Sequence, residues 1–278
     1  MITGHTRLLA VLGHPVRHSL SPVMHNAALA AAGLDACYVA LPVTDVGQVL
    51  PALWQMEFLG LNITIPFKQE VMSHLSYVTP EATAIGAVNT LYRGKSGWCG
   101  ANTDGLGFME PLRHWRGRQA VVLGYGGAAQ AVVWGLQQLG CRDIHVVTRR
   151  FPVVASPAAS VQLHGWSEVA ECLAQADIVV NTTPVGMAPA VNDSPLTAAQ
   201  LQQLPAGAWV YDLIYTPRPT RLLQMARDLG YFTQDGLAML VGQGAAAWPY
   251  WFGRPAPVSV MTAALEQHLS TPSSSGHY

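Results

Sequence analysis

Short apolar strands that alternate with helical patterns predict an α/β fold with two domains. The alternation runs from residue 7 to about residue 104 and starts again at Gln119. A strand, a helix and another strand favour a parallel sheet, because the helix carries the chain back to the edge where the first strand began. The 278 residues, half of them hydrophobic, suffice for two such sheets. We expect one α/β domain of residues 1–104 plus 239–278 with a mainly parallel sheet, and another of residues 105–238.

Start and stop signals mark the elements of the first domain. Ser21 before Pro22 predicts a helix over 21–33, with Ser21 as the N-cap and Gly33 as its end. The turn "RGKSG" predicts a hairpin. The other expected elements are strands over 7–13, 36–43 and 61–66, and helices over 45–60, 68–76, 79–86 and from about residue 104.

The second domain begins with a strand, a glycine loop and a helix. Gly124, Gly126 and Ala129 fit the pattern G-x-G-x-x-A, in which the glycines allow a tight turn and close approach of a pyrophosphate to the helix N-terminus. A purely structural turn is the alternative, but the strands on both sides favour a nucleotide site in a Rossmann-type domain. Further strands are expected over 144–149, 177–183, 208–215 and 231–236, and helices over 220–230, 237–253 and 258–270, the last two packing on the first domain.

The residues after the second strand of this domain indicate which dinucleotide binds. A site for NAD usually places Asp or Glu there, where it holds the ribose 2′-hydroxyl. Here Thr148, Arg149 and Arg150 follow instead. Two guanidinium groups favour the 2′-phosphate through charge-assisted hydrogen bonds, although a pair of solvated arginines is the alternative. We therefore predict NADP as the cofactor.

Composition excludes several classes of partner. Charged residues are 11% of the chain and the formal net charge is −1, so the basic surface of a nucleic-acid-binding protein is not expected. No apolar run is long enough to span a membrane. Four scattered cysteines, without a Cys-x-x-Cys pair, are typical of reduced thiols in a cytoplasmic protein. The ten histidines are scattered along the chain, so no metal site is expected.

Eight motifs in order make the chain resemble the shikimate dehydrogenase family over residues 8 to about 268. They are "HSLSP", "GLNITIPFK", "IGAVNTL", "GANTDGLG", "GYGGAA", "NTTPVGM", "VYDLIYTPRPTRLL" and "DGLAMLVGQGA". The resemblance implies a substrate domain followed by an NADP domain, and the reversible NADPH-dependent reduction of 3-dehydroshikimate to shikimate. It also implies a small-molecule substrate and a monomer or homodimer.

The resemblance assigns roles to residues at the matched positions. Ser19 and Ser21 would bind the substrate carboxylate, and Lys68 and Asp104 would form the catalytic pair and also contact the substrate. The other implied substrate residues are Thr64, Asn89, Tyr215 and Gln243. The implied cofactor residues are Gly124, Gly126, Gly127, Ala128, Ala129, Thr148, Arg149, Arg150, Thr182, Leu213 and Gly236.

Other interpretations of these residues stay open. Ser21 and Asp104 could be simple helix N-caps, Thr64 could be a packed strand residue, and Asn89 could belong to the hairpin. Lys68 is one of only two lysines among 15 basic residues, and a lysine can exchange a proton where an arginine cannot.

Two other functions remain as alternatives. One is a broader quinate/shikimate dehydrogenase that uses NAD, which the arginines and Ser21 oppose, since relatives acting on quinate tend to carry threonine there. The other is a non-catalytic NADP sensor, which would not need a lysine–aspartate pair.

Overall fold

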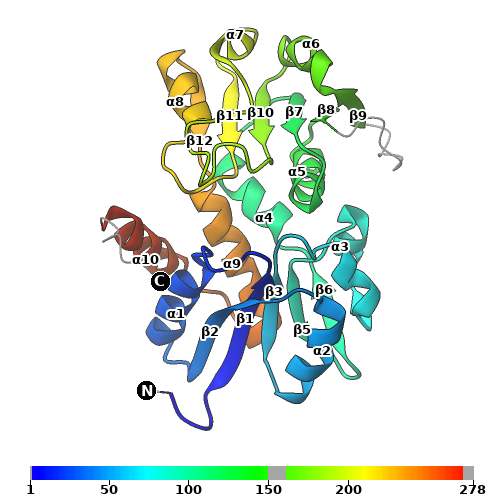
Figure 1. Cartoon of the computed structure of the whole chain (residues 1–278), viewed down its shortest axis with the longest axis vertical. Coiled ribbons are helices and arrows are strands. Elements are labelled where there is room, and N and C mark those ends of the chain that lie inside the picture. Colours follow the sequence, from blue (N-terminus) through cyan, green and yellow to red (C-terminus); the bar gives the residue numbers. More distant parts are fainter. Residues whose placement is uncertain (1, 150–160, 272–278) are drawn as a thin grey trace. The chain divides into compact units, whose positions relative to one another are not determined.

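The computed structural model describes residues 2–149 and 161–271, and it divides into two compact units (Figure 1). Unit 1 is Met1–Thr103 with Val241–Tyr278, and unit 2 is Asp104–Leu240. In this division Asp104 belongs to unit 2, and the second crossing, between Leu240 and Val241, lies inside the helix Leu237–Phe252. The expected proline-rich loop 151–160 and the tail from 272 lie outside the described residues.

Unit 1 contains a mixed six-stranded sheet in the order β2-β1-β3-β5-β6-β4. β1 is parallel to both β2 and β3, whereas β5 runs antiparallel to β3 and β6. β5 and β6 form the hairpin that "RGKSG" predicts. The strands are β1 (Arg7–Gly13), β2 (Ala36–Pro42), β3 (Gly60–Ile63), β4 (Tyr77–Val78), β5 (Thr90–Arg93) and β6 (Trp98–Ala101).

Helices cover this sheet, and their ends follow most of the expected signals. Thr79 caps its helix by accepting a hydrogen bond from the Ala82 N–H, and Gly86 ends that helix with φ 73°. The segment expected as a helix over 68–76 forms only a 3₁₀ helix, Glu70–His74. The helices are α1 (Ser21–Ala31), α2 (Val46–Gln55), α3 (Pro80–Ile85), α9 (Leu237–Phe252) and α10 (Val258–Ser270).

The C-terminal part of α9 packs on the sheet of unit 1, as expected. Trp248 is fully buried, and the indole N–H of Trp251 donates to the Leu91 carbonyl at 2.9 Å. Gly60 in β3 lies so close that an added Cβ would stand 2.1 Å from the Trp251 indole nitrogen. A segment distant in sequence therefore completes this core.

Unit 2 contains a fully parallel six-stranded sheet in the order β12-β11-β10-β7-β8-β9. The chain starts at β7, adds β8 and β9 on one side, and then returns to add β10, β11 and β12 on the other. β9 was not expected from the sequence. The strands are β7 (Gln119–Leu123), β8 (Asp143–Thr148), β9 (Val161–Gly165), β10 (Ile178–Asn181), β11 (Trp209–Asp212) and β12 (Phe232–Gln234).

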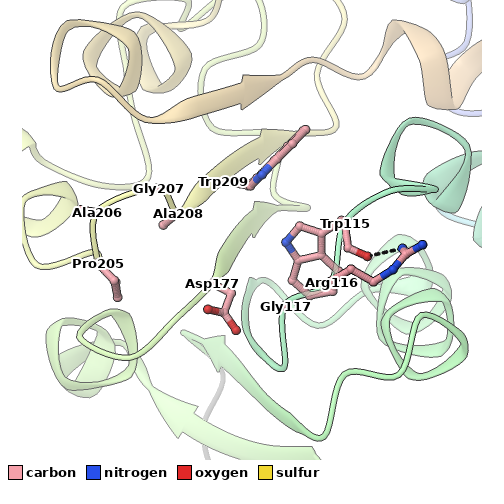
Figure 2. A pocket seen from close by; sticks show the side chains of 9 residues that line it. All are labelled: Trp115, Arg116, Gly117, Asp177, Pro205, Ala206, Gly207, Ala208 and Trp209. Carbon is pink, nitrogen blue, oxygen red and sulfur yellow. Dashed lines mark hydrogen bonds between the residues drawn. The ribbon is translucent and has the colours of Figure 1, made fainter.

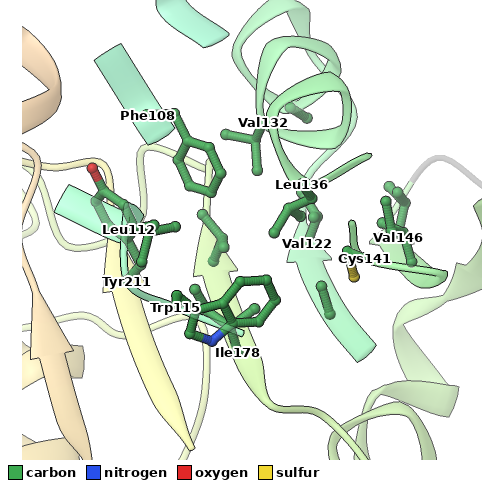
Figure 3. Packing of buried hydrophobic residues seen from close by; sticks show 14 of the residues in the cluster. Phe108, Leu112, Trp115, Val122, Val132, Leu136, Cys141, Val146, Ile178 and Tyr211 are labelled. Carbon is green, nitrogen blue, oxygen red and sulfur yellow. The ribbon is translucent and has the colours of Figure 1, made fainter. Parts of the chain in front are cut away.

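The two faces of this sheet carry separate hydrophobic clusters, because the central strands are buried on both sides. One cluster packs Phe108 and Leu136 against Val122 and Ile178 (Figure 3). Phe108 also stacks on Tyr211, with ring centroids 5.2 Å apart. The helices are α4 (Asp104–Met109), α5 (Gly127–Gln138), α6 (Val169–Leu173), α7 (Ala198–Leu201) and α8 (Arg221–Asp228).

None of the helices in the described part of the chain combines the length and apolar character that crossing a membrane requires.

Candidate functional site

The loops after β1 and β3 meet at the carboxyl edge of the sheet in unit 1. The His14 N–H donates to the Ile65 carbonyl at 3.0 Å, and the Thr64 N–H donates to the Leu12 carbonyl at 2.9 Å. An added Cβ at Gly13 would lie 2.3 Å from Thr64 Cγ2, so only glycine lets the two loops approach this closely. Thr64 follows β3 rather than alternating within it, which corrects its interpretation as a strand residue.

The two serines of "HSLSP" have roles that differ from the sequence interpretation. Leu20 is the N-cap of α1, and Ser21 is the first helical residue, so Ser21 is not the cap. The Ser19 hydroxyl accepts a hydrogen bond from the Ser21 N–H at 3.3 Å, and it therefore supports the helix start itself. Ser21 is buried and shares a side-chain hydrogen bond with Tyr38, whose pKa is raised well above its usual value by burial.

Asn89 organises a buried polar network at the same edge. Its side-chain oxygen accepts from the Thr103 N–H at 2.8 Å, and its amide donates to the Thr103 hydroxyl at 3.0 Å and to Gln243 Oε1 at 3.3 Å. Asn89 precedes β5 and lies outside the hairpin turn. The network continues through Thr90 to Asn62, and Asn62 accepts from the Tyr38 hydroxyl at 2.6 Å.

Lys68 lies beside this network through its backbone. Its carbonyl accepts from the Val88 N–H at 2.8 Å, which holds the segment 64–68 against the residue that precedes Asn89. Lys68 is half-buried. The nearby 3₁₀ helix begins only at Glu70 and has five residues, so Lys68 lies outside the helix that was expected over 68–76.

Asp104 begins the helix that follows Thr103 in the chain. It is 4% exposed and is the first residue of α4 rather than its N-cap. α4 packs closely on α5, since an added Cβ at Gly105 would lie 2.5 Å from the Trp134 ring. This contact fixes the helix that carries Asp104 within unit 2.

The glycine loop lies at the carboxyl end of β7. Gly124 has φ +105°, and an added Cβ would stand 2.7 Å from Thr182 Oγ1. Gly126 is the N-cap of α5 and has no side-chain cap, and a Cβ placed on it would meet nothing within 4 Å. The loop residues Gly127, Ala128 and Ala129 form the first turn of this 12-residue helix. The open space at this helix N-terminus fits the pyrophosphate of a dinucleotide.

Loops from the other strands gather at the same edge of unit 2. The Thr182 hydroxyl donates to the Leu123 carbonyl at 2.7 Å, and the Gly236 N–H donates to the Ile214 carbonyl at 3.1 Å. An added Cβ at Gly236 would lie 1.9 Å from the Leu213 carbonyl oxygen. β7 and β10 are neighbours at the point where the strand order reverses, which is where parallel sheets bind nucleotides. Tyr215, half-buried, follows in the same loop.

A buried aspartate that sequence reasoning missed anchors these loops. Asp212 is fully buried at the end of β11, and it accepts hydrogen bonds from the Thr220 hydroxyl, the Ile214 N–H and the Asn181 amide at 2.7, 3.1 and 3.0 Å. Burial raises the pKa of Asp212 to about 6 against the opposing effect of these bonds. In the sequence, the carboxylate at the end of the apolar run "WVYD" is the signal that could have identified this buried residue.

The end of β8 carries the residues expected to select NADP. Thr148 is buried as its last residue, and Arg149 is exposed. No carboxylate stands at this strand end in the described residues, where an NAD site would place one. Arg150 lies outside the described residues.

A pocket of about 270 Å³ opens at the opposite, amino edge of this sheet (Figure 2). Trp115, Asp177 and Trp209 line it. Asp177 accepts hydrogen bonds from the Arg118 and Gln119 N–H groups at 2.6 and 3.0 Å, so its carboxylate holds the backbone at the start of β7 in place. None of the residues that line this pocket was expected to bind substrate or cofactor.

Comparisons with known proteins agree with this arrangement. The sequence model described as the shikimate dehydrogenase substrate binding domain matches residues 11–91, and the one described as the shikimate 5'-dehydrogenase C-terminal domain matches residues 236–266. A protein of Thermosynechococcus vestitus named shikimate dehydrogenase (NADP(+)) is 49% identical over 281 residues, which covers 97% of this chain and 98% of that protein.

Solved structures extend the similarity to the fold. A shikimate dehydrogenase in complex with NADP+ has a TM-score of 0.87 at 32% identity and covers 98% of both chains. The enzyme of Thermus thermophilus, in complex with NADP(H) and shikimate, has a TM-score of 0.84 at 36% identity and covers 94% of this chain and 99% of that chain. On sequence and fold over nearly its whole length, the chain belongs to the shikimate dehydrogenase family.

Proposed function

We propose that this chain catalyses the reversible NADPH-dependent reduction of 3-dehydroshikimate to shikimate, a step in the biosynthesis of aromatic amino acids. The observation that carries the proposal is the buried amide and hydroxyl network around Asn89, in a chain 49% identical to a shikimate dehydrogenase (NADP(+)). The loops of unit 2 support it, because they leave open space before an uncapped helix N-terminus.

The substrate residues follow from the chemistry of a small ring with several hydroxyls and a carboxylate. The hydroxyls of Ser19 and Ser21 would donate hydrogen bonds to the carboxylate. Thr64, Asn89 and Gln243 would bind the ring hydroxyls, together with Tyr215. Amides and hydroxyls suit this purpose because each can donate and accept, and the network holds the Asn89 side chain in one orientation before the substrate arrives.

Lys68 and Asp104 would manage the proton. When the carbonyl is reduced, its oxygen becomes an alkoxide that must receive a proton, and the Lys68 ammonium is suited to donate it. Asp104 would accept a hydrogen bond from the Lys68 ammonium and, once the proton has been transferred, from the hydroxyl of the product. In the reverse direction, the neutral Lys68 amine would take the proton from the shikimate hydroxyl. A positioned acid or base of this kind contributes about 10²–10⁴-fold to the rate.

NADPH, when bound, supplies the hydride for the carbonyl carbon. The backbone N–H groups at Gly126 and Gly127 would hold its pyrophosphate, and Arg149 with Arg150 would hold the 2′-phosphate. Thr148, Thr182, Leu213 and Gly236 would line the remaining edge. Asp212 would act indirectly, by holding the loops after β10 and β11 in place.

A steady-state assay with two acids and two cofactors tests the proposal. Purified protein should oxidise shikimate with NADP far more efficiently than quinate with NADP or shikimate with NAD. Equal or better efficiency with NAD would reject the cofactor assignment, and preference for quinate would support the broader dehydrogenase. Tight NADP binding without turnover of either acid would favour the sensor.

We also infer a monomer or homodimer that works in the cytoplasm. All four cysteines are unpaired, which suits a reducing compartment. Light scattering during gel filtration would measure the molecular mass in solution, and a mass above that of a dimer would contradict this inference.

A further inference from the structure

Three side chains far apart in sequence come together at the β9 edge of unit 2. His145 Nδ1 in β8 and His164 Nε2 in β9 lie 2.9 Å apart. Cys172, in the short helix α6, points its sulfur toward the same place, and the three ligand atoms all lie within 4.8 Å of one another. Cys172 is buried and both histidines are half-buried, so the cluster is sheltered from bulk solvent.

A carboxylate holds one of these rings from behind. Glu168 Oε1 lies 3.6 Å from His164 Nδ1, the nitrogen that faces away from His145. The other oxygen of Glu168 accepts from the Gly165 N–H at 2.8 Å, which fixes the carboxylate. A proton on His164 Nδ1, directed at Glu168, leaves a lone pair on Nε2. Histidines that bind metal ions usually have such a carboxylate behind them.

We propose that His145, His164 and Cys172 bind one transition-metal ion of the Zn²⁺ type, with water as the fourth ligand. Two imidazoles and a thiolate are the donors that Zn²⁺ prefers, whereas Mg²⁺ and Ca²⁺ require oxygen ligands. Around a tetrahedral Zn²⁺ the ligand atoms stand about 3.4–3.6 Å apart, as its bond lengths require. The observed spacings bracket this value, so small side-chain rotations complete the site.

The ion would act on structure and not on the reaction. β9 is the edge strand and pairs with a neighbour on one side only, β8, and α6 is a short helix of five residues. One ion bonded to β8, β9 and α6 would join all three. Metal binding converts the Cys172 thiol to a thiolate, and His145 keeps its ring proton on Nε2. The alternative is a simple hydrogen bond between two neutral imidazoles beside an unreactive thiol.

Titration of the chelator-treated full-length protein with Co²⁺ and then Zn²⁺ separates these two interpretations. The wild type should develop thiolate-to-Co²⁺ absorption that saturates at one equivalent and disappears when Zn²⁺ is added. Cys172→Ser should lose the absorption. The matched control Cys37→Ser, a half-buried cysteine of unit 1, should keep it. Absence of the absorption in the wild type, or its persistence in Cys172→Ser, would overturn the proposal.

A second variant keeps the test decisive even if Cys172→Ser does not fold. Glu168→Gln leaves all three ligands in place and changes only the group behind His164. It should keep the absorption while weakening Zn²⁺ about 10-fold, as outer-shell changes do. Binding to the wild type should also release protons as the thiol ionises. Unchanged Zn²⁺ affinity in Glu168→Gln, or no proton release, would contradict the assigned ligand set.

Discussion

The carboxyl edges of the two sheets are built from different parts of the chain. In unit 1 the edge is a network of side chains, in which Asn62, Asn89 and Thr103 bond one another. In unit 2 the edge is mainly backbone, where Gly124 and Gly236 let neighbouring loops approach closely and Gly126 leaves open space before α5. A ring with several hydroxyls needs donors and acceptors in fixed directions, whereas a pyrophosphate needs close access to N–H groups.

This difference predicts how each edge responds to substitution. Removing a side chain in unit 1 should leave buried partners without hydrogen bonds, which affects folding and function together. Adding a methyl group at a glycine of unit 2 should destabilise the fold where protein atoms fill the space, and should weaken cofactor binding where the space is open. Folding and cofactor binding can therefore be changed separately.

The largest effect is expected at the proton-transfer pair. Lys68→Ala and Asp104→Asn should each lower kcat by about 10²–10⁴-fold with a modest change in KM, because they remove proton transfer and orientation rather than binding. Steady-state kinetics with shikimate and NADP measure both constants. Lys95→Ala is the matched control, since Lys95 lies in the exposed hairpin turn, and it should behave as wild type. Near-normal kcat in both test variants would remove the pair from the mechanism.

Substitution of Asn89 should affect stability as well as activity. Asn89→Ala removes the acceptor of the fully buried Thr103 N–H, at a cost of about 1–3 kcal/mol for a buried group left unsatisfied. Urea denaturation should show a lower free energy of unfolding, and kcat/KM for shikimate should fall. Unchanged stability would mean that the network does not contribute to the fold of unit 1.

Two neighbouring glycines should separate folding from cofactor binding. Gly124→Ala forces a side chain into φ +105° beside Thr182 and should cost about 1–3 kcal/mol of stability. Gly126→Ala meets no protein atom, so its melting temperature should stay unchanged while the KM for NADP rises at least ~10-fold. Thermal melts and kinetics distinguish the two. Wild-type NADP affinity in Gly126→Ala would show that the pyrophosphate does not approach this residue.

Two buried groups, His25 in unit 1 and Asp212 in unit 2, should shift the stability in opposite directions as the pH falls. Burial lowers the pKa of His25 in unit 1 to about 3, so the unfolded chain binds the proton first, and stability falls as the pH drops below about 6.5. Burial raises the pKa of Asp212 in unit 2 to about 6, so the folded protein binds the proton first, and stability rises as the pH drops through 6.

Urea denaturation at pH 6.5 and pH 5 measures both contributions. Between pH 6.5 and pH 5, the free energy of unfolding of the wild type should fall by about 2 kcal/mol through His25 and rise by about 1 kcal/mol through Asp212. His25→Asn should not show this fall, and Asp212→Asn should not show this rise. Asparagine suits both positions because it can still accept a hydrogen bond but does not titrate. The same pH dependence in all three proteins would show that neither group titrates as its burial indicates.

The smallest effect is expected at the exposed arginine after β8. Arg149→Gln removes one of the two guanidinium groups assigned to the 2′-phosphate and should lower the preference for NADP over NAD about tenfold. The ratio of kcat/KM for the two cofactors is the readout, with Arg142→Gln, another exposed arginine of unit 2, as the control. An unchanged ratio would assign the 2′-phosphate to other residues.

Local signals in the sequence predicted most elements correctly. β1 and the helix over 79–86 were found because a strand or helix end is specified by residues only a few positions apart. β9 was missed because its mixed sequence "VQLHG" becomes a strand only by pairing with β8. The capping role expected for Ser21 was wrong because the preceding loop places Leu20 at the helix boundary, which no local pattern shows.

The sequence by itself determined most of the strands and helices, the glycine loop with its arginines, and the family. Tertiary structure alone decided that Asn89 meets Gln243, that Asp212 anchors two loops, and that His145 and His164 face each other. The physical reason is strand order. Motifs depend on neighbours along the chain, whereas these contacts depend on which strands pair and on which edge their loops emerge, and the whole fold settles both.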